Sequence, residues 1–177
     1  LVEPLSLLRS IFPATITFDV AMAENLPRVL ADTTQIHQVV MNLCTNAAHA
    51  MSGRVGRLGV KLDVVELDDA QAGEIGRLVP GPHVRLTVSD TGRGMSAEVL
   101  ARLYEPFFTT KGPGEGTGLG LAVVHGVMQS HEGAVTVRSV PGQGTTFELF
   151  FPGQTASAPV AQTFETPKDD LPRGRGE

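Results

Sequence analysis

The stretch from Thr33 to Met51, TTQIHQVVMNLCTNAAHAM, limits the possible folds more than any other part of the chain. Its apolar residues recur at steps of three and four, the spacing of one face of an α-helix. They are Ile36, Val39, Val40, Leu43, Ala47 and Met51. Asp32 can cap this helix, and Gln35 follows three residues later, as in a capping box. The pattern predicts a helix that packs one face on a core.

The opposite side of the same helix carries neutral hydrogen-bonding groups. They are Gln35, Gln38, Asn42, Asn46 and His49, and no charged residue lies between Thr33 and Gly53. A solvated face usually carries Lys, Glu and Arg, and Asn is unfavourable inside a helix. The stripe therefore indicates a semi-buried polar site, where an Asn carbonyl could serve as the single protein ligand of Mg²⁺ beside nucleotide phosphates and water. The alternative is a helix that packs its amides against a neighbouring loop.

Strand patterns surround this helix. Alternating or β-branched runs occur at 14–20, 56–67 and 83–90, and two further runs, AVTVRSV and TTFELFF, are joined by PGQG at 141–144 as a hairpin. A short helix is expected at 96–104, capped by Ser96, and a longer one at 117–130. This mixture predicts an α/β two-layer sandwich, with a mixed, mostly antiparallel sheet on about three helices, rather than a doubly wound parallel sheet.

The expected domain covers residues 13–152. Residues 1–12 have the pattern of the end of a helix, and residues 153–177 mix Pro, Gly, Ala and charges without periodicity, which is typical of a disordered linker.

The stretch GPGEGTGLGLAVVHGVM, 112–128, is a glycine-rich segment that enters the last helix. Gly116, Gly118 and Gly120 follow G-x-G-x-G, which differs from the dinucleotide fingerprint, and Lys111 precedes the glycines, which differs from the Walker loop. A helix N-terminus after glycines still favours phosphate, through its unpaired N–H groups and its dipole. A flexible loop that happens to be rich in glycine is the alternative.

Asp90 ends the strand 83–90 on the same face as Val84, Leu86 and Val88, because strand side chains alternate. An inward carboxylate needs hydrogen-bond donors. Turn N–H groups of Thr91 and Gly92 could supply them, and so could an exocyclic amine such as that of adenine. The same alternation directs Thr145 of the last strand towards the same pocket.

Composition narrows the partners. The net charge is −5 and there is no run of Lys or Arg, which argues against nucleic acid or an anionic membrane. Cys44 is the only cysteine, so neither a disulfide framework nor a zinc cluster is expected and a reducing, cytoplasmic compartment is favoured. The sequence has no run of membrane-span length and no signal peptide, and it is compatible with a fragment of a membrane-anchored protein.

Five segments in order resemble the N, G1, F, G2 and G3 boxes of the ATP-binding domain of sensor histidine kinases. They are NLCTNAAHAM, DTGRGM, EPFFTTK, GTGLGLAVVHGVM and GQGTTF. The resemblance covers nearly all of 13–152 and extends to the GHKL superfamily, which includes DNA gyrase, mismatch-repair ATPases and heat-shock chaperones. It implies an α/β sandwich that binds ATP and Mg²⁺ beneath a mobile lid, which here would run from Lys111 to Gly118.

The resemblance also implies roles for individual residues. Asn46 corresponds to the Mg²⁺ ligand, Asp90 to the acceptor for adenine, and Gly92 and Gly94 to the turn beneath the base. Further residues that the resemblance assigns to the ATP site are Asn42, His49, Phe107, Phe108, Lys111, Gly116, Thr117, Gly118, Leu119, Gly120 and Thr145. Phe107 and Phe108 correspond to anchors of the lid, and Lys111 is the candidate for a phosphate contact that acts with Asn46 in catalysis. His49 differs from the Lys or Arg of other subgroups.

Phosphoryl transfer is favoured over hydrolysis, because Asn42 occupies the position of the glutamate base in the superfamily's ATPases and cannot accept a proton. None of the five histidines lies in an acceptor pattern. The expected acceptor is a histidine on a separate dimerisation domain of the same protein, whose second helix would end at 1–12. Further expected partners are a response regulator or receiver domain, to which 153–177 could lead, and a second subunit of a homodimer. The alternatives are a non-catalytic nucleotide-responsive module and a GHKL ATPase.

Overall fold

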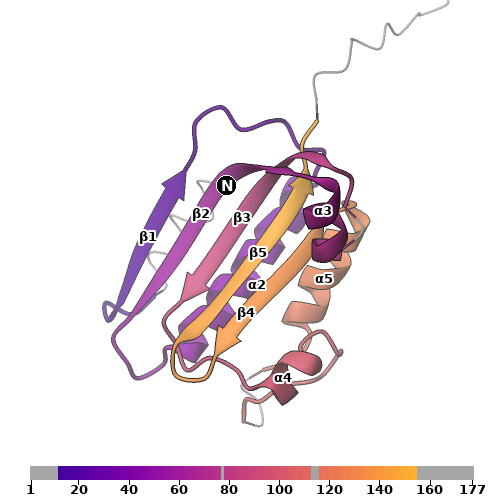
Figure 1. The fold of residues 1–177 in the computed structure, drawn as a ribbon. Helices are drawn as coiled ribbons and strands as arrows, with labels where there is room; N and C mark the ends of the chain where they lie inside the picture. Colours follow the sequence, from indigo (N-terminus) through magenta and orange to yellow (C-terminus); the bar gives the residue numbers. More distant parts are fainter. Residues whose placement is uncertain (1–11, 77, 113–115, 155–177) are drawn as a thin grey trace, which may run out of the picture.

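The computed structural model describes residues 12–76, 78–112 and 116–154. Figure 1 shows a five-stranded sheet with helices packed against it. The elements in chain order are β1 (Ile16–Met22), α2 (Thr33–Ala50), β2 (Gly56–Leu67), α3 (Asp69–Gly76), β3 (Gly81–Asp90), α4 (Ala97–Ala101), α5 (Gly120–Ser130), β4 (Ala134–Val140) and β5 (Gly144–Pro152).

The strands lie in the order β1-β2-β3-β5-β4. β1 runs parallel to β2, and each of the other neighbouring pairs is antiparallel. β2 and β3 pair with each other, with Leu62 opposite Leu86, and β4 and β5 form the predicted hairpin. The predicted mixed, mostly antiparallel sheet is therefore confirmed.

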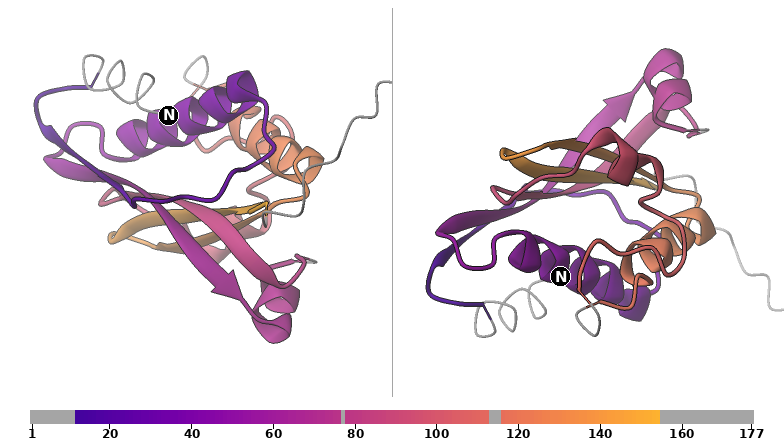
Figure 2. Two further views of the ribbon diagram at one scale, coloured as in Figure 1. Left: turned by 90° about the horizontal axis from the view of Figure 1, so that it is seen from above. Right: turned by 90° about the horizontal axis from the view of Figure 1, so that it is seen from below.

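Helices α2 and α5 cover one face of the sheet, as the views from above and below show (Figure 2). The apolar stripe of α2 is buried there: Val39 and Val40 are fully buried, and Leu43, Ala47 and Met51 nearly so. Alternate residues of the central strands, such as Leu86 and Leu149, meet this helix face. The two-layer sandwich predicted from the sequence is confirmed.

Helix α3 lies on the opposite face of the sheet, and the sequence analysis did not predict it. Its Ala72 packs with Leu67, Leu78 and Phe150 in a second, smaller apolar cluster. The overlooked signal is a reciprocal cap. The Gln71 N–H donates to Asp68 Oδ1 at 2.8 Å, and the Asp68 N–H donates to Gln71 Oε1 at 3.1 Å.

Helix ends differ from prediction in two places. α5 begins at Gly120 rather than at residue 117, because Gly118 adopts a left-handed φ of 67° that no α-helix accommodates. α4 ends at Ala101, although Ser96 caps it as expected.

At the beginning of α2, the Asp32 side chain caps the helix as predicted, but the Gln35 side chain does not complete the capping box. Asp32 accepts the N–H groups of Thr34 and Gln35, at 2.8 and 3.2 Å. The Asp32 N–H, however, donates to Nε2 of His131 at 3.1 Å, where a capping box would use the Gln35 side chain. His131 follows α5, so this contact ties the beginning of α2 to the end of α5.

Three predictions fall partly or wholly outside the described residues: the helix end at 1–12, the centre of the lid at 113–115, and the linker at 153–177. Within the described part of the chain, no helix combines the length and apolarity needed to span a membrane.

Candidate functional site

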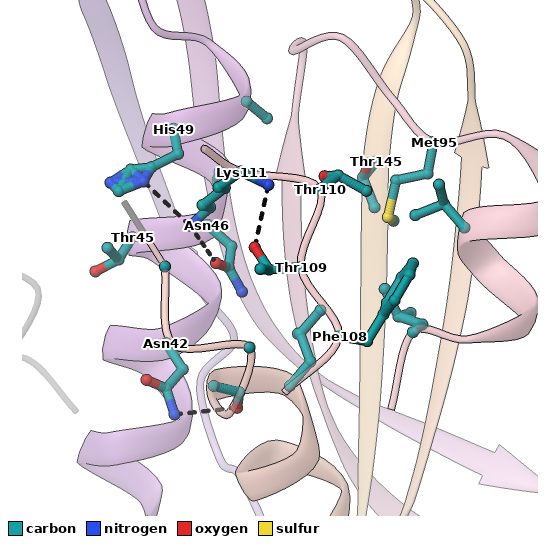
Figure 3. A pocket seen from close by; sticks show the side chains of 18 of the residues that line it. Asn42, Thr45, Asn46, His49, Met95, Phe108, Thr109, Thr110, Lys111 and Thr145 are labelled. Carbon is teal, nitrogen blue, oxygen red and sulfur yellow. Dashed lines mark hydrogen bonds between the residues drawn. The ribbon is translucent and has the colours of Figure 1, made fainter. Parts of the chain in front are cut away.

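A cavity of about 670 Å³ opens between the polar side of α2, the carboxyl end of β3 and the segment that leads into α5 (Figure 3). This cavity brings together most of the predicted site residues. Those that line it are Asn42, Asn46, His49, Asp90, Gly94, Phe108, Lys111, Gly116, Thr117, Gly118, Gly120 and Thr145. Segments far apart in the sequence therefore share one concave site, which is the form that ligand sites usually take.

Three predicted residues, Gly92, Phe107 and Leu119, do not line the cavity. Gly92 is buried beside it, where an added Cβ would meet Ala50 and the Asp90 carboxylate. Phe107 is 74% exposed and Leu119 38% exposed. Gln35 and Gln38, from the first half of the polar stripe, also lie outside, so only the second half of α2 contributes amides.

Asp90 lies at the end of β3 and is paired in register with Thr145 of β5, as the alternation predicted. Its Oδ1 accepts the Gly92 N–H at 2.7 Å, which is one of the two donors considered from the sequence. Burial raises the pKa of Asp90, and the backbone N–H groups of Gly92 and Thr145 oppose that rise. A half-buried carboxylate directed into a cavity can accept a hydrogen bond from an amine of a ligand.

Gly94 fixes the turn after Asp90. It has a left-handed φ of 66°, and a Cβ there would collide with the carbonyl oxygen of Val140. The Gly142 N–H donates to the Arg93 carbonyl at 2.7 Å, and the Arg93 N–H donates to the Ala50 carbonyl at 3.0 Å. The turn is thus held between the β4–β5 hairpin and the end of α2, and both the glycine-rich turn and the hairpin border the site.

The other end of the cavity is formed by α2 and the beginning of α5. Asn42 Nδ2 donates to the Gly120 carbonyl at 3.2 Å, which joins the two helices. No side chain caps the first turn of α5. Its first N–H groups therefore have no side-chain acceptor, and Gly120 and Leu121 of this turn line the cavity. Such a helix end favours an anion.

Lys111 crosses this end of the cavity. Its Nζ donates to Asn46 Oδ1 at 3.3 Å and lies 3.2 Å from His49 Nδ1. The close-up shows the lysine side chain reaching to α2 beside both residues (Figure 3). The cavity thus has a carboxylate at one end and a cation at the other.

The residues fit a single Mg²⁺ ion that takes most of its ligands from phosphates and water. Asn46 presents a carbonyl oxygen to the cavity, and that oxygen already holds a cation, the Lys111 ammonium. Among the described residues, no three His, Cys, Asp or Glu side chains cluster in a way that would hold a metal by themselves. A protein site with one or two oxygen ligands is usual for Mg²⁺ bound together with a nucleotide.

Sequence reasoning missed much of the cavity wall. Residues that line it without having been named as site residues include Met41, Thr45, Met95, Ser96, Val99, Leu103, Thr109, Thr110, Leu121 and Phe147. Several have only a packing signal: Phe147 shares the inward face with Thr145, and Leu103 belongs to a short helical pattern. Thr109 and Thr110 follow Phe108 directly, so their place in the wall could have been inferred from that of Phe108.

Phe107 has an unusual backbone for an aromatic residue. Its φ is 67°, which is rare for a bulky side chain, and its N–H donates to the Gly118 carbonyl at 2.9 Å. A Cβ at Gly118 would collide with the Phe107 backbone, so the two ends of the segment 107–118 depend on that glycine. The turn leaves Phe107 in solvent and directs Phe108 into the cavity, where Arg102 lies 4.2 Å from its ring centroid.

The fold and the cavity together define a class of protein: two-layer α/β sandwiches with a cavity between the helix layer and the end of a mixed sheet. Residues 31–155 match the family model described as "Histidine kinase-, DNA gyrase B-, and HSP90-like ATPase". The chain belongs to this family, as its five sequence boxes indicated.

Sensor kinases are among its relatives. Sensor kinase CckA of Brucella abortus (strain 2308) is 40% identical over 124 residues, which cover 70% of this chain and 13% of CckA. Sensor histidine kinase ZraS of Escherichia coli (strain K12) is 39% identical over 129 residues, 73% of this chain and 24% of ZraS. The chain therefore spans a quarter or less of these relatives.

Solved structures agree with this assignment. The mycobacterial sensor histidine kinase MprB aligns with a TM-score of 0.66 at 28% identity, covering 86% of this chain and 93% of that one. Full-length ShkA in complex with AMPPNP aligns with a TM-score of 0.64 at 28% identity, covering 89% of this chain and 31% of ShkA.

Proposed function

We propose that this domain binds Mg·ATP in the cavity and donates the γ-phosphoryl group to a histidine on a separate dimerisation domain of the same protein. The reaction would make the parent protein a protein-histidine kinase of a two-component system, with a response regulator or receiver domain as the next acceptor. Family membership and the sensor kinases among its relatives support this function. ATP as substrate favours a cytoplasmic location.

The observation that carries the proposal is the opposite character of the two ends of the cavity. The half-buried Asp90 would accept the exocyclic amine of adenine at one end. Asn46, Lys111 and the first N–H groups of α5 would surround the phosphates at the other. Mg²⁺, when bound through Asn46, would neutralise phosphate charge, which is the main contribution that phosphoryl transfer requires.

Transfer rather than hydrolysis is supported by Asn42. A hydrolase needs a base to orient water, and the amide of Asn42 cannot accept a proton. Its Nδ2 instead donates a hydrogen bond to the Gly120 carbonyl. Asn42 thus joins α2 to α5 and helps to position the phosphate end.

The acceptor domain would dock beside the phosphate end. Phe107 and Leu119 are exposed apolar residues at the two ends of the segment that borders the cavity. The strained turn at Phe107 keeps its ring in solvent, and strain of this kind is common at functional contacts. The parent protein would act as a homodimer, so that each cavity meets an acceptor histidine.

Asp90→Asn tests nucleotide binding. The amide would present a donor to the adenine amine, and we expect the affinity for Mg·ADP to fall by about tenfold or more in calorimetry, with the fold retained. Asp19→Asn makes the same chemical change on β1, remote from the cavity, and should leave affinity unchanged. Unchanged affinity in a folded Asp90→Asn variant would contradict the assignment of Asp90.

Transfer itself is tested by adding the parent's dimerisation domain to this chain with labelled ATP. Label on the acceptor histidine is expected. Steady release of phosphate without an acceptor would indicate an ATPase, and nucleotide binding without either reaction would indicate a nucleotide-responsive module.

A further inference from the structure

The ammonium of Lys111 contacts the side-chain oxygen of Asn46, which fits Mg²⁺. Lys111 Nζ lies 3.3 Å from Asn46 Oδ1 and 3.2 Å from His49 Nδ1. Asn46 and His49 are three residues apart on α2, so their side chains lie on the same helix face. Lys111 comes from a segment more than sixty residues away, and it also interacts with other parts of the chain.

The chemistry of the three side chains fixes the proton positions in this contact. An ammonium has three donors and no acceptor. His49 Nδ1 can therefore take part only as an acceptor, which requires a neutral ring with its proton on Nε2. Asn46 must likewise present its oxygen, not its NH₂ group, to the lysine.

A metal ion and an ammonium cannot occupy this place together. Mg²⁺ binds oxygen ligands at about 2.0–2.1 Å and is doubly charged, so a metal on Asn46 Oδ1 would repel an ammonium held at the same oxygen. The contact between Lys111 Nζ and Asn46 Oδ1 must break before Asn46 can bind the metal.

We infer that Lys111 is a substitute cation, which occupies the metal position at Asn46 until Mg·nucleotide displaces it, and that His49 is the positioning residue that holds it there. This inference rests on the proposed function, because it assigns Asn46 to Mg²⁺. It gives His49 a role opposite to that of a phosphate ligand: His49 favours the nucleotide-free state. Displacement leaves the ammonium available to the phosphates.

Calorimetry of ADP with magnesium and with EDTA tests the competition. The dissociation constant of ADP in EDTA, divided by that in magnesium, measures how much magnesium strengthens binding. His49→Leu removes the acceptor that helps to hold Lys111, and we expect it to raise this ratio about fivefold by tightening only the magnesium complex. His49→Gln restores an acceptor, and Gln38→Leu changes an exposed amide of the same helix outside the cavity. Both should keep the wild-type ratio.

Two outcomes would overturn the inference. If His49→Leu weakens binding equally with and without magnesium, His49 contacts the nucleotide itself. If the ratio does not change, Lys111 does not compete with the metal.

Nuclear magnetic resonance of the nucleotide-free protein separates this inference from the proposed function. The nitrogen shifts of His49 should show Nδ1 as an acceptor, and Lys111→Met should abolish that preference. Titration with Mg²⁺ at saturating ADP should move the Asn46 side-chain amide signal at about fivefold lower concentration in His49→Leu than in the wild type. Equal midpoints would overturn the inference even if nucleotide binds. A wild-type chain that binds no nucleotide would contradict the proposed function, while the nitrogen shifts of His49 would still decide whether its ring accepts from Lys111.

Discussion

The hydroxyl of Tyr104 is a buried donor with no hydrogen-bond partner among the described residues. Its ring stacks on His125 of α5, with centroids 4.8 Å apart and planes at 26°. Burial raises the pKa of Tyr104 to about 12. The ring therefore joins the segment before Phe107 to α5. The hydroxyl, in contrast, is removed from water without a hydrogen bond to the protein, which lowers the stability of the fold.

Tyr104→Phe is expected to stabilise the domain by about 1 kcal/mol, because it keeps the stacked ring and removes the unpaired hydroxyl. Urea denaturation followed by circular dichroism measures the change. Tyr104→Leu, which loses the stacking as well, should be destabilised relative to Tyr104→Phe. A loss of stability in Tyr104→Phe would mean that water satisfies the hydroxyl.

Single residues of the site differed in how well the sequence predicted them. Strand alternation and a short turn placed Asp90 and Thr145, because both depend on local geometry. The contact of Lys111 with His49 depends on how a long loop returns to α2, and no local pattern encodes that. The exposure of Phe107 was missed for the same reason, since it follows from a left-handed turn that an aromatic residue rarely adopts.

Among the elements, α3 depends on one side-chain cap more than the longer helices do. It has 8 residues and a single buried side chain, Ala72. The paired hydrogen bonds between Asp68 and Gln71 satisfy backbone N–H groups at its beginning. The sequence analysis missed this helix because its apolar periodicity is weak, although α2, β3 and the last hairpin were predictable from strong periodicity.

Asp68→Ala should destabilise the domain by about 1 kcal/mol, which is typical for the loss of an N-cap. Hydrogen exchange should rise first in residues 69–76, because the short helix opens locally. Glu74→Ala changes an exposed residue of the same helix and should have little effect. Equal exchange in the two variants would show that the cap does not hold α3.

The face of the sheet that carries α3 also has a row of ion pairs, which runs from β2 to β4. Arg85 on β3 bonds Asp63 at 2.8 Å and Glu148 at 3.2 Å, and Arg138 pairs with Glu148. The hydrogen bond from Arg85 is the main reason that the pKa of Asp63 falls to about 2. The row links strands that also contribute Leu67 and Phe150 to the apolar cluster beneath α3 on this face.

Asp63 gives a pH dependence with a definite sign. The pKa of Asp63 in the folded protein is lower than its ordinary value of 3.8, so its contribution is complete above about pH 4 and is lost as the pH falls toward 2. We expect Asp63→Asn to remove about 1–2 kcal/mol of that acid dependence in denaturation measured from pH 6 to pH 2.5. Asp90 has the opposite effect on stability. Its pKa is raised in the folded protein, so its protonation at low pH favours the folded state. An unchanged acid profile in Asp63→Asn would contradict the role of the pair.

At the scale of the whole molecule, the histidines lie in structural positions. His83 is buried in the sheet, His125 stacks on Tyr104, and His131 accepts the Asp32 N–H. His49 faces Lys111, and His37 lies on α2 outside the cavity. Of the five, only His49 lines the cavity, and its Nδ1 lies 3.2 Å from Lys111 Nζ.

We therefore expect the isolated chain to bind Mg·ATP without phosphorylating itself. The chain is incubated with labelled ATP, and the label that stays on the protein is counted before and after acid treatment. The same assay with the added dimerisation domain is the positive control. Stable label on the chain alone would contradict the prediction.

The cavity lies where the two layers of the sandwich meet. Asp90 and Thr145 belong to the sheet, whereas Asn42, Asn46 and the first turn of α5 belong to the helices. A nucleotide that contacts both would join two layers that otherwise pack mainly through apolar side chains. At a ligand concentration of 100 times the dissociation constant, such binding adds about 2.7 kcal/mol to the unfolding free energy. The domain would then be most resistant to heat, and to proteases that attack the unfolded chain, when it is ready to react.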